Sequence, residues 1–108
     1  MATEARKPIP AIAIEPHQWV ELSAILRAHL PGRRVWAFGS RATGVRLKRY
    51  SDLDLAVEGA PLTLREAGLM EEALDESRLP FKVDVVSLDA LTPGFRARIE
   101  PDFVLIQS

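Results

Sequence analysis

The sequence predicts an α/β protein of the α+β kind, with a small mixed sheet of three to four strands flanked by helices. Short apolar, β-prone segments alternate with segments whose apolar residues recur at helical spacing. A strand–helix–strand unit spans residues 52–87, and such a crossover makes neighbouring strands parallel. With 108 residues the chain corresponds to about one domain. We therefore expect an N-terminal extension over residues 1–14 and a folded domain over residues 15–108.

The N-terminal extension carries two prolines and the apolar run Ile12-Ala13-Ile14. One interpretation is a flexible tail. The other is a short edge strand across residues 11–14, because proline is tolerated in a sheet only at an edge. The sequence leaves both interpretations open.

A first helix is expected over residues 15–30, followed by a strand over residues 35–38. Pro16 suits the first position of a helix, where its missing N–H costs nothing. The segment after the helix begins with Pro31, which ends helical periodicity. Apolar residues on one helical face form the expected core contact: Trp19, Leu22, Ile25, Leu26 and Leu30.

The middle of the chain predicts a turn of helix over residues 40–44, a strand over residues 52–57 and a helix over residues 63–77. Thr63 and Glu66 have the spacing of a capping box, in which each side chain satisfies the other residue's backbone N–H. The buried face of this helix is assigned to Leu64, Ala67, Met70, Ala73 and Leu74.

The C-terminal third predicts a strand over residues 81–87, a short helix from Thr92-Pro93 to Pro101, and an edge strand over residues 103–106. The strands at 52–57 and 81–87 should be parallel neighbours. An antiparallel pairing of the strands at 35–38 and 52–57 would bring Gly39 beside Asp52.

Three aspartates are candidate metal ligands. Asp52 and Asp54 are two residues apart on a predicted strand, so both carboxylates point to one face. Like charges at this spacing repel, and a divalent cation such as Mg²⁺, which prefers oxygen ligands, relieves the repulsion. Asp84 lies within an apolar strand, where a charge is costly unless it is paired or metal-bound. The alternatives are a turn residue at Asp52, pairing of Asp54 with Arg41 or Lys82, and a salt bridge at Asp84.

Gly39 and Ser40 follow a strand and precede a predicted turn of helix, an arrangement that suits phosphate binding. Glycine permits close approach of a ligand to the backbone, and N–H groups at a helix start bind anions. Arg41 is a further candidate phosphate contact, with a structural salt bridge as the alternative. The basic run over residues 46–50 either attracts an anionic nucleotide or partner or is a solvated loop.

Composition excludes several classes of function. Apolar residues make up 47% and charged residues 27%, as in ordinary globular proteins, and the net charge of −1 is unlike the basic surface of a nucleic-acid coat. We therefore expect no direct nucleic-acid binding and no template-directed polymerase. The absence of cysteine excludes disulfides and thiolate zinc sites. No stretch of the sequence is apolar over a membrane-spanning length and no signal pattern is visible, so the cytoplasm is the default location.

The spacing of these candidate residues resembles a family signature. The segment Gly39-Ser40, then 11 residues, then Asp52-Leu53-Asp54-Leu55, is similar to the motif of the polymerase-β-like nucleotidyltransferase superfamily. The stretch over residues 39–44 with Ser51-Asp52-Leu53-Asp54-Leu55 is especially similar to its minimal nucleotidyltransferase (MNT) subgroup. The segment over residues 83–86 resembles the strand that carries the family's third carboxylate. The resemblance covers about residues 16–106.

The resemblance implies a nucleotidyltransferase fold and a role for each motif residue. Asp52 and Asp54 would hold two Mg²⁺ ions that bind the triphosphate, and Asp84 would complete the metal site and help deprotonate an acceptor hydroxyl. Gly39 and Ser40 would bind the β- and γ-phosphates of ATP, with Arg41 as an additional contact. Such a site performs phosphoryl transfer mainly by positioning groups and stabilising charge.

The resemblance also implies a partner. Small MNT proteins resemble antitoxins encoded beside a HEPN-domain ribonuclease toxin, so the acceptor would be a hydroxyl, such as that of a tyrosine, on the toxin, and the reaction AMPylation. The protein would then form a hetero-oligomer, with a homodimer as the other possibility. Two alternative functions are a non-catalytic antitoxin that acts by binding, and a small-molecule nucleotidyltransferase of the antibiotic-modifying type.

Overall fold

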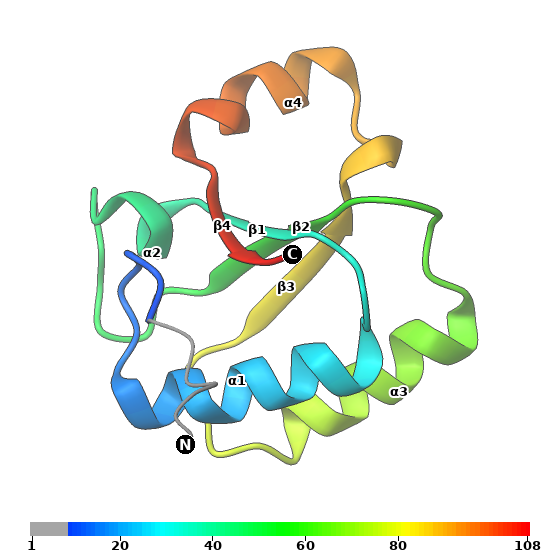
Figure 1. The fold of residues 1–108 in the computed structure, drawn as a ribbon. Helices are drawn as coiled ribbons and strands as arrows, with labels where there is room; N and C mark the ends of the chain where they lie inside the picture. The colour runs from blue at the N-terminus through cyan, green and yellow to red at the C-terminus, as the bar shows by residue number, and fades with distance from the viewer. Residues whose placement is uncertain (1–8) are drawn as a thin grey trace, which may run out of the picture.

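The computed structural model describes residues 9–108, which form one four-stranded sheet with helices on both faces (Figure 1). The two long helices, α1 and α3, cover one face, and the short α4 lies on the other. The helices are α1 (Pro16–His29), α2 (Ser40–Thr43), α3 (Leu64–Asp75) and α4 (Pro93–Ile99), with 3₁₀ turns at Leu88–Ala90 and Glu100–Asp102. The strands are β1 (Val35–Phe38), β2 (Leu53–Val57), β3 (Val83–Ser87) and β4 (Val104–Gln107).

The sheet has the order β3-β2-β1-β4, so β3 and β4 are its edges. β2 and β3 are parallel, as the crossover through α3 predicts. β1 is antiparallel to both β2 and β4. The predicted α+β class and mixed sheet are confirmed, including the C-terminal edge strand.

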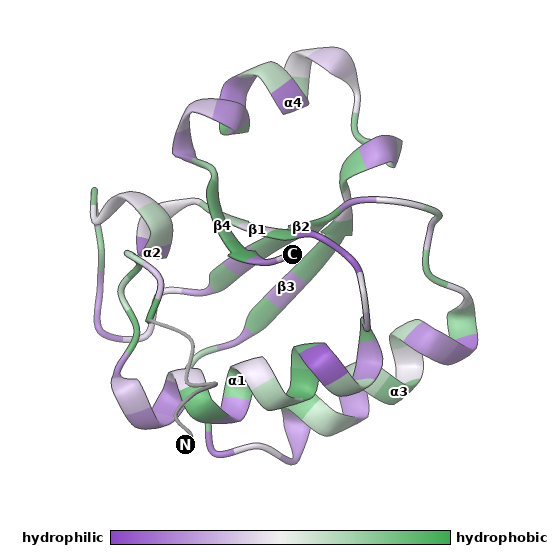
Figure 2. Ribbon diagram, viewed as in Figure 1, coloured by the Kyte–Doolittle hydropathy of each residue, from purple (hydrophilic) through white to green (hydrophobic). Residues whose placement is uncertain are grey.

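The main hydrophobic core lies between the sheet and the two long helices. Leu22 and Leu26 of α1 and Leu53 and Leu55 of β2 are almost completely inaccessible to solvent. Figure 2 shows the strands as the most continuously hydrophobic part of the chain, while α1 and α3 alternate apolar and polar residues. Each long helix therefore buries one face against the sheet and exposes the other.

Local sequence signals set the helix boundaries. Thr63 accepts the backbone N–H of Glu66, and the Glu66 side chain accepts the N–H of Thr63, so the predicted capping box is formed. Pro16 opens α1 at its first turn. The Thr92 hydroxyl caps α4 by accepting the N–H of Phe95.

The structure differs from some expectations drawn from the sequence. Of the two interpretations left open for residues 11–14, the edge strand does not form; residues 11–13 bend, and Ile12 and Ile14 pack against the main core. Leu64 and Ala67 do not belong to the buried face of α3. Leu64, the first residue of the helix, lies beyond the end of the core and is 94% exposed, and Ala67, three residues later, is exposed as well. The part of the N-terminal extension over residues 1–8 lies outside the described residues.

None of the helices within residues 9–108 has both the length and the apolar character needed to cross a membrane.

Candidate functional site

The three candidate aspartates lie at one end of the central strands. In the parallel pairing of β2 with β3, Asp54 lies directly opposite Asp84. In the antiparallel pairing of β1 with β2, Asp54 lies opposite Phe38, the last residue of β1. Asp52 immediately precedes β2 and is exposed. The backbone register thus places Asp54 and Asp84, from two adjacent strands, opposite each other beside the end of β1, which Gly39 and Ser40 follow.

Alternation along the strand separates these aspartates from the main core. Leu53 and Leu55 face the long helices and are fully buried, so Asp54 between them faces the side of the sheet on which α4 lies. Ala56 follows Asp54 on the same face and packs with Phe38, Leu88 and Ile99. The carboxylates therefore stand at the border of a small apolar cluster.

Gly39 packs directly against the central carboxylate. It has a φ of 79°, a conformation that L side chains rarely adopt, and a Cβ built on it would collide with the Oδ2 atom of Asp54. The sequence predicts Gly39 beside Asp52; its closest functional neighbour is instead the side chain of Asp54, because β1 ends one residue before Gly39 and opposite Asp54. Glycine is required here by both the backbone angle and the space.

Ser40 begins α2 directly after this glycine. α2 is a single turn that ends at Gly44, whose N–H bonds to the Ser40 carbonyl. The corner predicted for phosphate binding is therefore a real turn at the end of β1. Its contact with a nucleotide stays a prediction.

The charge of Asp54 is destabilised by its surroundings. Burial raises the pKa of its carboxyl, and the neighbouring charges of Asp84 and Asp52 raise it further. Both neighbours are thus close enough to repel Asp54. Carboxylate oxygens that repel one another in this way form a donor set suited to a hard divalent cation.

Asp84 is held by a lysine in this arrangement. Its Oδ1 lies 3.5 Å from Nζ of Lys82, two residues earlier on the same face of the strand, and both side chains are substantially exposed. Exposed pairs of this kind contribute little stability and exchange easily. As the side chains stand, residues 9–108 contain no group of three carboxylate or imidazole side chains gathered closely enough around one point to hold a metal ion. Ligation of a metal by Oδ1 of Asp84 would replace its ion pair with Lys82.

The ion pairs in the structure differ in part from those considered from the sequence. Lys82 pairs with Asp84, so the salt bridge considered for Asp84 exists, although it is exposed. Among the described residues, Asp54 forms no ion pair with Lys82 or Arg41; the ion pairs present are Lys82–Asp84 and Arg96–Glu100.

Arg41 is a buried anchor. Only 7% of the residue is exposed, and its guanidinium donates from Nε to the Ser51 carbonyl (2.6 Å), from Nη1 to the Ala13 carbonyl (2.9 Å) and from Nη2 to the Arg49 carbonyl (2.9 Å). The guanidinium carbon also lies 4.1 Å from the ring centre of Phe81. Burial lowers the pKa of Arg41, while the charge of Asp52 opposes that effect.

This bonding favours a structural role for Arg41 over the predicted phosphate contact, since a nucleotide would have to displace hydrogen bonds to three backbone segments. Two of its contacts lie close in sequence to the candidate site: the hydrogen-bonded Ser51 precedes Asp52, and Phe81, under the guanidinium, lies three residues before Asp84. Arg41 also fixes the N-terminal segment, where the N–H of Ala13 donates to the carbonyl of Arg41 (2.7 Å). The predicted salt bridge is replaced by carbonyl acceptors.

Sequence reasoning did not identify Ala13 or Phe81 as parts of this arrangement. Ala13 offers only its backbone, so no side-chain signal marks it. Phe81 reads as an ordinary strand residue, and its contact with Arg41 spans 40 positions of sequence. The basic loop over residues 46–50 is exposed, with the guanidinium of Arg49 over the ring of Tyr50, and its attraction for a nucleotide stays a prediction.

Comparison with known proteins agrees with this geometry. Residues 20–106 match the family described as the nucleotidyltransferase domain. The chain is also similar to a Haemophilus influenzae protein named probable protein adenylyltransferase MntA, with 38% identity over 95 residues that cover 87% of this chain and 82% of the relative. The span matched by the family includes Gly39, Asp54 and Asp84, and it exceeds half of the chain. The chain therefore belongs to the nucleotidyltransferase domain family and is a nucleotidyl-transferring enzyme.

Proposed function

We propose that this protein is a magnesium-dependent protein adenylyltransferase that transfers AMP from ATP to a hydroxyl of a HEPN-domain toxin and thereby acts as an antitoxin. The observation that carries the enzymatic part is the packing of Gly39 against Asp54, which itself lies in register with Asp84. The name of the Haemophilus relative supports a protein as the acceptor and an adenylyl group as the cargo.

The donor set supports magnesium as the metal. Asp52, Asp54 and Asp84 supply carboxylate oxygens. Burial and, after it, repulsion by Asp84 and Asp52 raise the pKa of Asp54, and a bound cation would stabilise its charged form. Bound Mg²⁺ would neutralise the triphosphate and stabilise the charge that develops during transfer. Asp52 and Asp54 would hold the ions, and Gly39 and Ser40 would leave room for the β- and γ-phosphates beside them.

In this reaction the acceptor hydroxyl oxygen bonds to the α-phosphorus as the bond from that phosphorus to the bridging oxygen breaks, and pyrophosphate leaves. We assign acceptance of the hydroxyl proton to a carboxylate oxygen of Asp84. Release of this carboxylate from Lys82 prepares it for that role, since an ion pair with an ammonium group weakens a base.

The test is a transfer assay. The purified protein is incubated with Mg²⁺, ATP labelled at the α-phosphate and the HEPN-type protein encoded by the neighbouring gene. We expect label on the HEPN protein, and no label when EDTA removes the metal. Absence of transfer to this protein in the presence of Mg²⁺ and ATP would overturn the proposal and leave inhibition by binding alone as the explanation of any antitoxin effect.

Variants separate catalysis from binding. Joint replacement Asp52→Asn and Asp54→Asn should reduce transfer by at least about a thousandfold, a barrier change of about 4 kcal/mol, while circular dichroism shows an intact fold. Glu76→Gln, which neutralises an exposed carboxylate next to α3, is the control and should transfer normally. If the double variant still protects cells that express the toxin, neutralisation occurs by docking, and the proposed antitoxin mechanism is wrong.

A further inference from the structure

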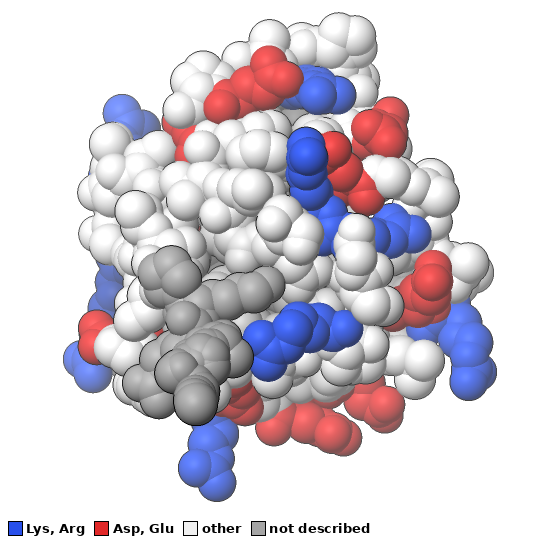
Figure 3. Space-filling view, in the orientation of Figure 1, with Lys and Arg blue, Asp and Glu red and all other residues white. Residues whose placement is uncertain are grey.

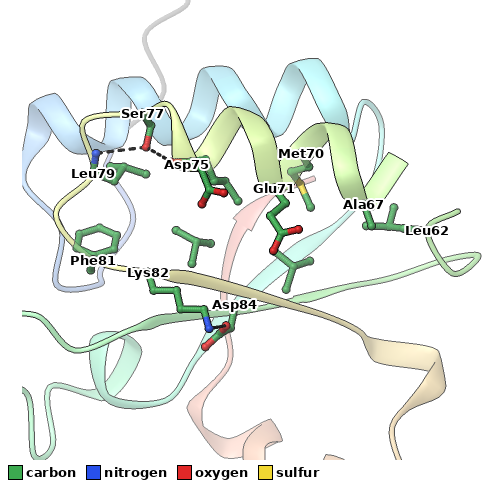
Figure 4. A pocket seen from close by; sticks show the side chains of 13 residues that line it. Leu62, Ala67, Met70, Glu71, Asp75, Ser77, Leu79, Phe81, Lys82 and Asp84 are labelled. Atoms are coloured by element: carbon green, nitrogen blue, oxygen red, sulfur yellow. Dashed lines mark hydrogen bonds and ion pairs between the residues drawn. The ribbon is translucent and has the colours of Figure 1, made fainter. Parts of the chain in front are cut away.

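A groove lies between α3 and the edge strand β3 and meets the carboxylate site at Asp84 (Figure 4). It holds a cavity of about 480 Å³ whose lining combines apolar side chains, among them Met70, Leu74, Val83 and Val85, with charged ones. One helical face of α3 forms its upper side. Figure 4 shows the side chains of Glu71 and Asp75 directed from that helix toward the cavity.

β3 presents an open edge to this groove. The N–H of Leu53 in β2 donates to the carbonyl of Lys82 (2.8 Å). Because alternate residues of a parallel strand bond to the same neighbour, the backbone groups of Val83, Val85 and Ser87 point away from β2. No strand among residues 9–108 lies on that side. All five residues of β3 are only half-buried.

Natural edge strands are commonly protected by a bulge, a proline, inward-pointing charges or a covering segment. β3 pairs with β2 without a register shift and contains no proline, and its only charged residue is Asp84. An additional strand beside β3 would lie next to the residues of α3 that line the groove. Alternate side chains of that strand would point into the cavity. The groove therefore fits an extended peptide segment.

The charged side chains that line the groove indicate which kind of peptide segment it would bind. α3 carries four acidic residues and one arginine, and two of the acidic residues, Glu71 and Asp75, line the groove one helical turn apart. Like charges at this spacing destabilise a helix, and neither has an ion-pair partner within residues 9–108. The lysine on the groove, Lys82, is already paired with Asp84. Acidic side chains also gather along the lower edge of the molecule, where α1 and α3 lie (Figure 3).

A second copy of this chain is a poor match for the groove. Pairing of β3 with β3 about a two-fold axis is isologous, so the same surface would face itself. Such pairing would bring both copies of Glu71 and Asp75 toward one another, and unpaired like charges across an interface disfavour it. A segment that carries lysine or arginine between its apolar residues has the complementary charge.

We propose that the α3–β3 groove is the docking site for the acceptor protein, which adds an extended segment of alternating apolar and basic residues to the free edge of β3. This inference rests on the proposed function, in that the acceptor is taken to be a protein. Asp84 lies on β3 and also borders the groove. A segment bound along β3 would therefore bring its own chain to the carboxylate assigned to accept the proton.

The groove is tested first without the acceptor. The probes are two seven-residue peptides, one alternating lysine with valine and the other glutamate with valine, and binding to the full chain is followed by NMR of backbone amides. We expect the lysine peptide to bind and to shift amides of β3 and α3, and the glutamate peptide to bind at least about tenfold more weakly. Equal binding of the two peptides, shifts confined to other elements, or dimerisation of the chain through β3 would overturn the proposal.

Charge-reversed variants locate the effect on the groove. Joint replacement Glu71→Lys and Asp75→Lys should weaken binding of the lysine peptide at least about tenfold. The matched control is Glu72→Lys with Glu76→Lys, which makes the same charge change in and just after α3 at exposed residues that do not line the groove. The control should stay within about threefold of wild type. Equal losses in both variants would show that the overall charge of the helix matters and not the groove.

Transfer to the HEPN protein separates this proposal from the proposed function. The variant with Glu71→Lys and Asp75→Lys, here the groove variant, should show a raised KM for the acceptor. Its binding of a fluorescent ATP analogue should be unchanged. If wild type transfers AMP and the groove variant does so with the same KM, the docking proposal is wrong and the proposed function stands. If wild type transfers nothing, the proposed function fails, and the peptide experiment still decides whether the groove binds basic segments.

Discussion

The two faces of the central sheet differ in what they bury. The face under α1 and α3 holds a cluster of twelve buried residues, whereas the face toward α4 holds a cluster of four among the described residues. Alternation in β2 makes the division visible, because Leu53, Leu55 and Val57 belong to the first cluster and Ala56 to the second, next to Asp54.

This difference shows how a small domain accommodates charges that repel. Destabilising groups such as Asp54 require stability from elsewhere, because small domains have only a modest margin. The larger cluster supplies it on the face that carries no carboxylate of the site. Substitutions on the two faces should consequently separate into those that lower stability and those that lower activity.

The largest expected effect is on stability, from Leu22→Ala on the helical face. Leu22 is fully buried at the centre of the larger cluster. Truncation of such a leucine costs about 2–5 kcal/mol, through lost burial and the cavity left behind. Urea unfolding should show this loss, while transfer per folded molecule stays unchanged. Leu105→Ala, at a leucine that is 40% exposed on β4, is the matched control and should cost less than about 1 kcal/mol. A loss of kcat in folded Leu22→Ala would contradict the separation of the two faces.

The next effect is on activity, from Gly39→Ala. The added methyl group must displace the Asp54 carboxylate, since the two would overlap, and alanine must also adopt an unfavourable φ. We expect kcat for nucleotidyl transfer to fall about a hundredfold, equivalent to about 2.7 kcal/mol. Gly44→Ala is the control, because Gly44 has a similar φ of 77° but open space around it. If both variants lose activity equally, backbone strain and not the contact with Asp54 is responsible.

Arg41 joins the segment before Asp52 to Phe81 of the larger cluster and should affect both properties, by smaller amounts. Arg41→Lys keeps the charge, but one ammonium group cannot reproduce a planar guanidinium that donates to three carbonyls. We expect a loss of about 1–3 kcal/mol in the free energy of unfolding. Because Ser51 would no longer be held before Asp52, transfer should fall about tenfold, or about 1.4 kcal/mol. Arg27→Lys, at an exposed arginine of α1, should change neither. Normal stability with strongly reduced ATP binding would restore the predicted phosphate contact.

Sequence reasoning succeeded where short-range patterns determine structure. The alternation around Asp54 predicts its face, and the crossover through α3 predicts that Asp84 lies on the neighbouring strand; the register places the two residues opposite each other. The capping box at Thr63 likewise depends on residues three apart. Each of these relations is local or follows from a general rule of chain connection.

The parts that sequence reasoning missed depend on contacts between distant segments. The acceptors of Arg41 include the carbonyl of Ala13, 28 residues away, and backbone carbonyls carry no sequence signal. Periodicity placed Leu64 on a buried face, but the helix extends beyond the core there. Lys82 pairs with Asp84, two residues away on its own strand, and not with Asp54 on the neighbouring strand; this local choice is the exception, because alternation places both aspartates on one face and does not decide between them.

The smallest expected effect is a gain in stability from Asp54→Asn. The folded state raises the pKa of Asp54 above the ordinary value of 3.8, so the unfolded chain ionises first as the pH rises. Ionisation of Asp54 therefore lowers the stability of the protein as the pH rises from the pKa of the unfolded chain through the pKa of the folded protein. The full loss persists at neutral pH. The variant should melt about 2–5 °C higher than wild type at pH 7, and this difference should shrink as the pH falls from the raised pKa of the folded protein towards 3.8 and vanish below it. Mg²⁺ should raise the Tm of wild type and leave that of the variant unchanged. Glu76→Gln is the control and should show neither the higher Tm nor the lost response to Mg²⁺. If Asp54→Asn melts below wild type at pH 7, the carboxylate stabilises the fold, and the face of the sheet that carries Asp54 is not under electrostatic strain.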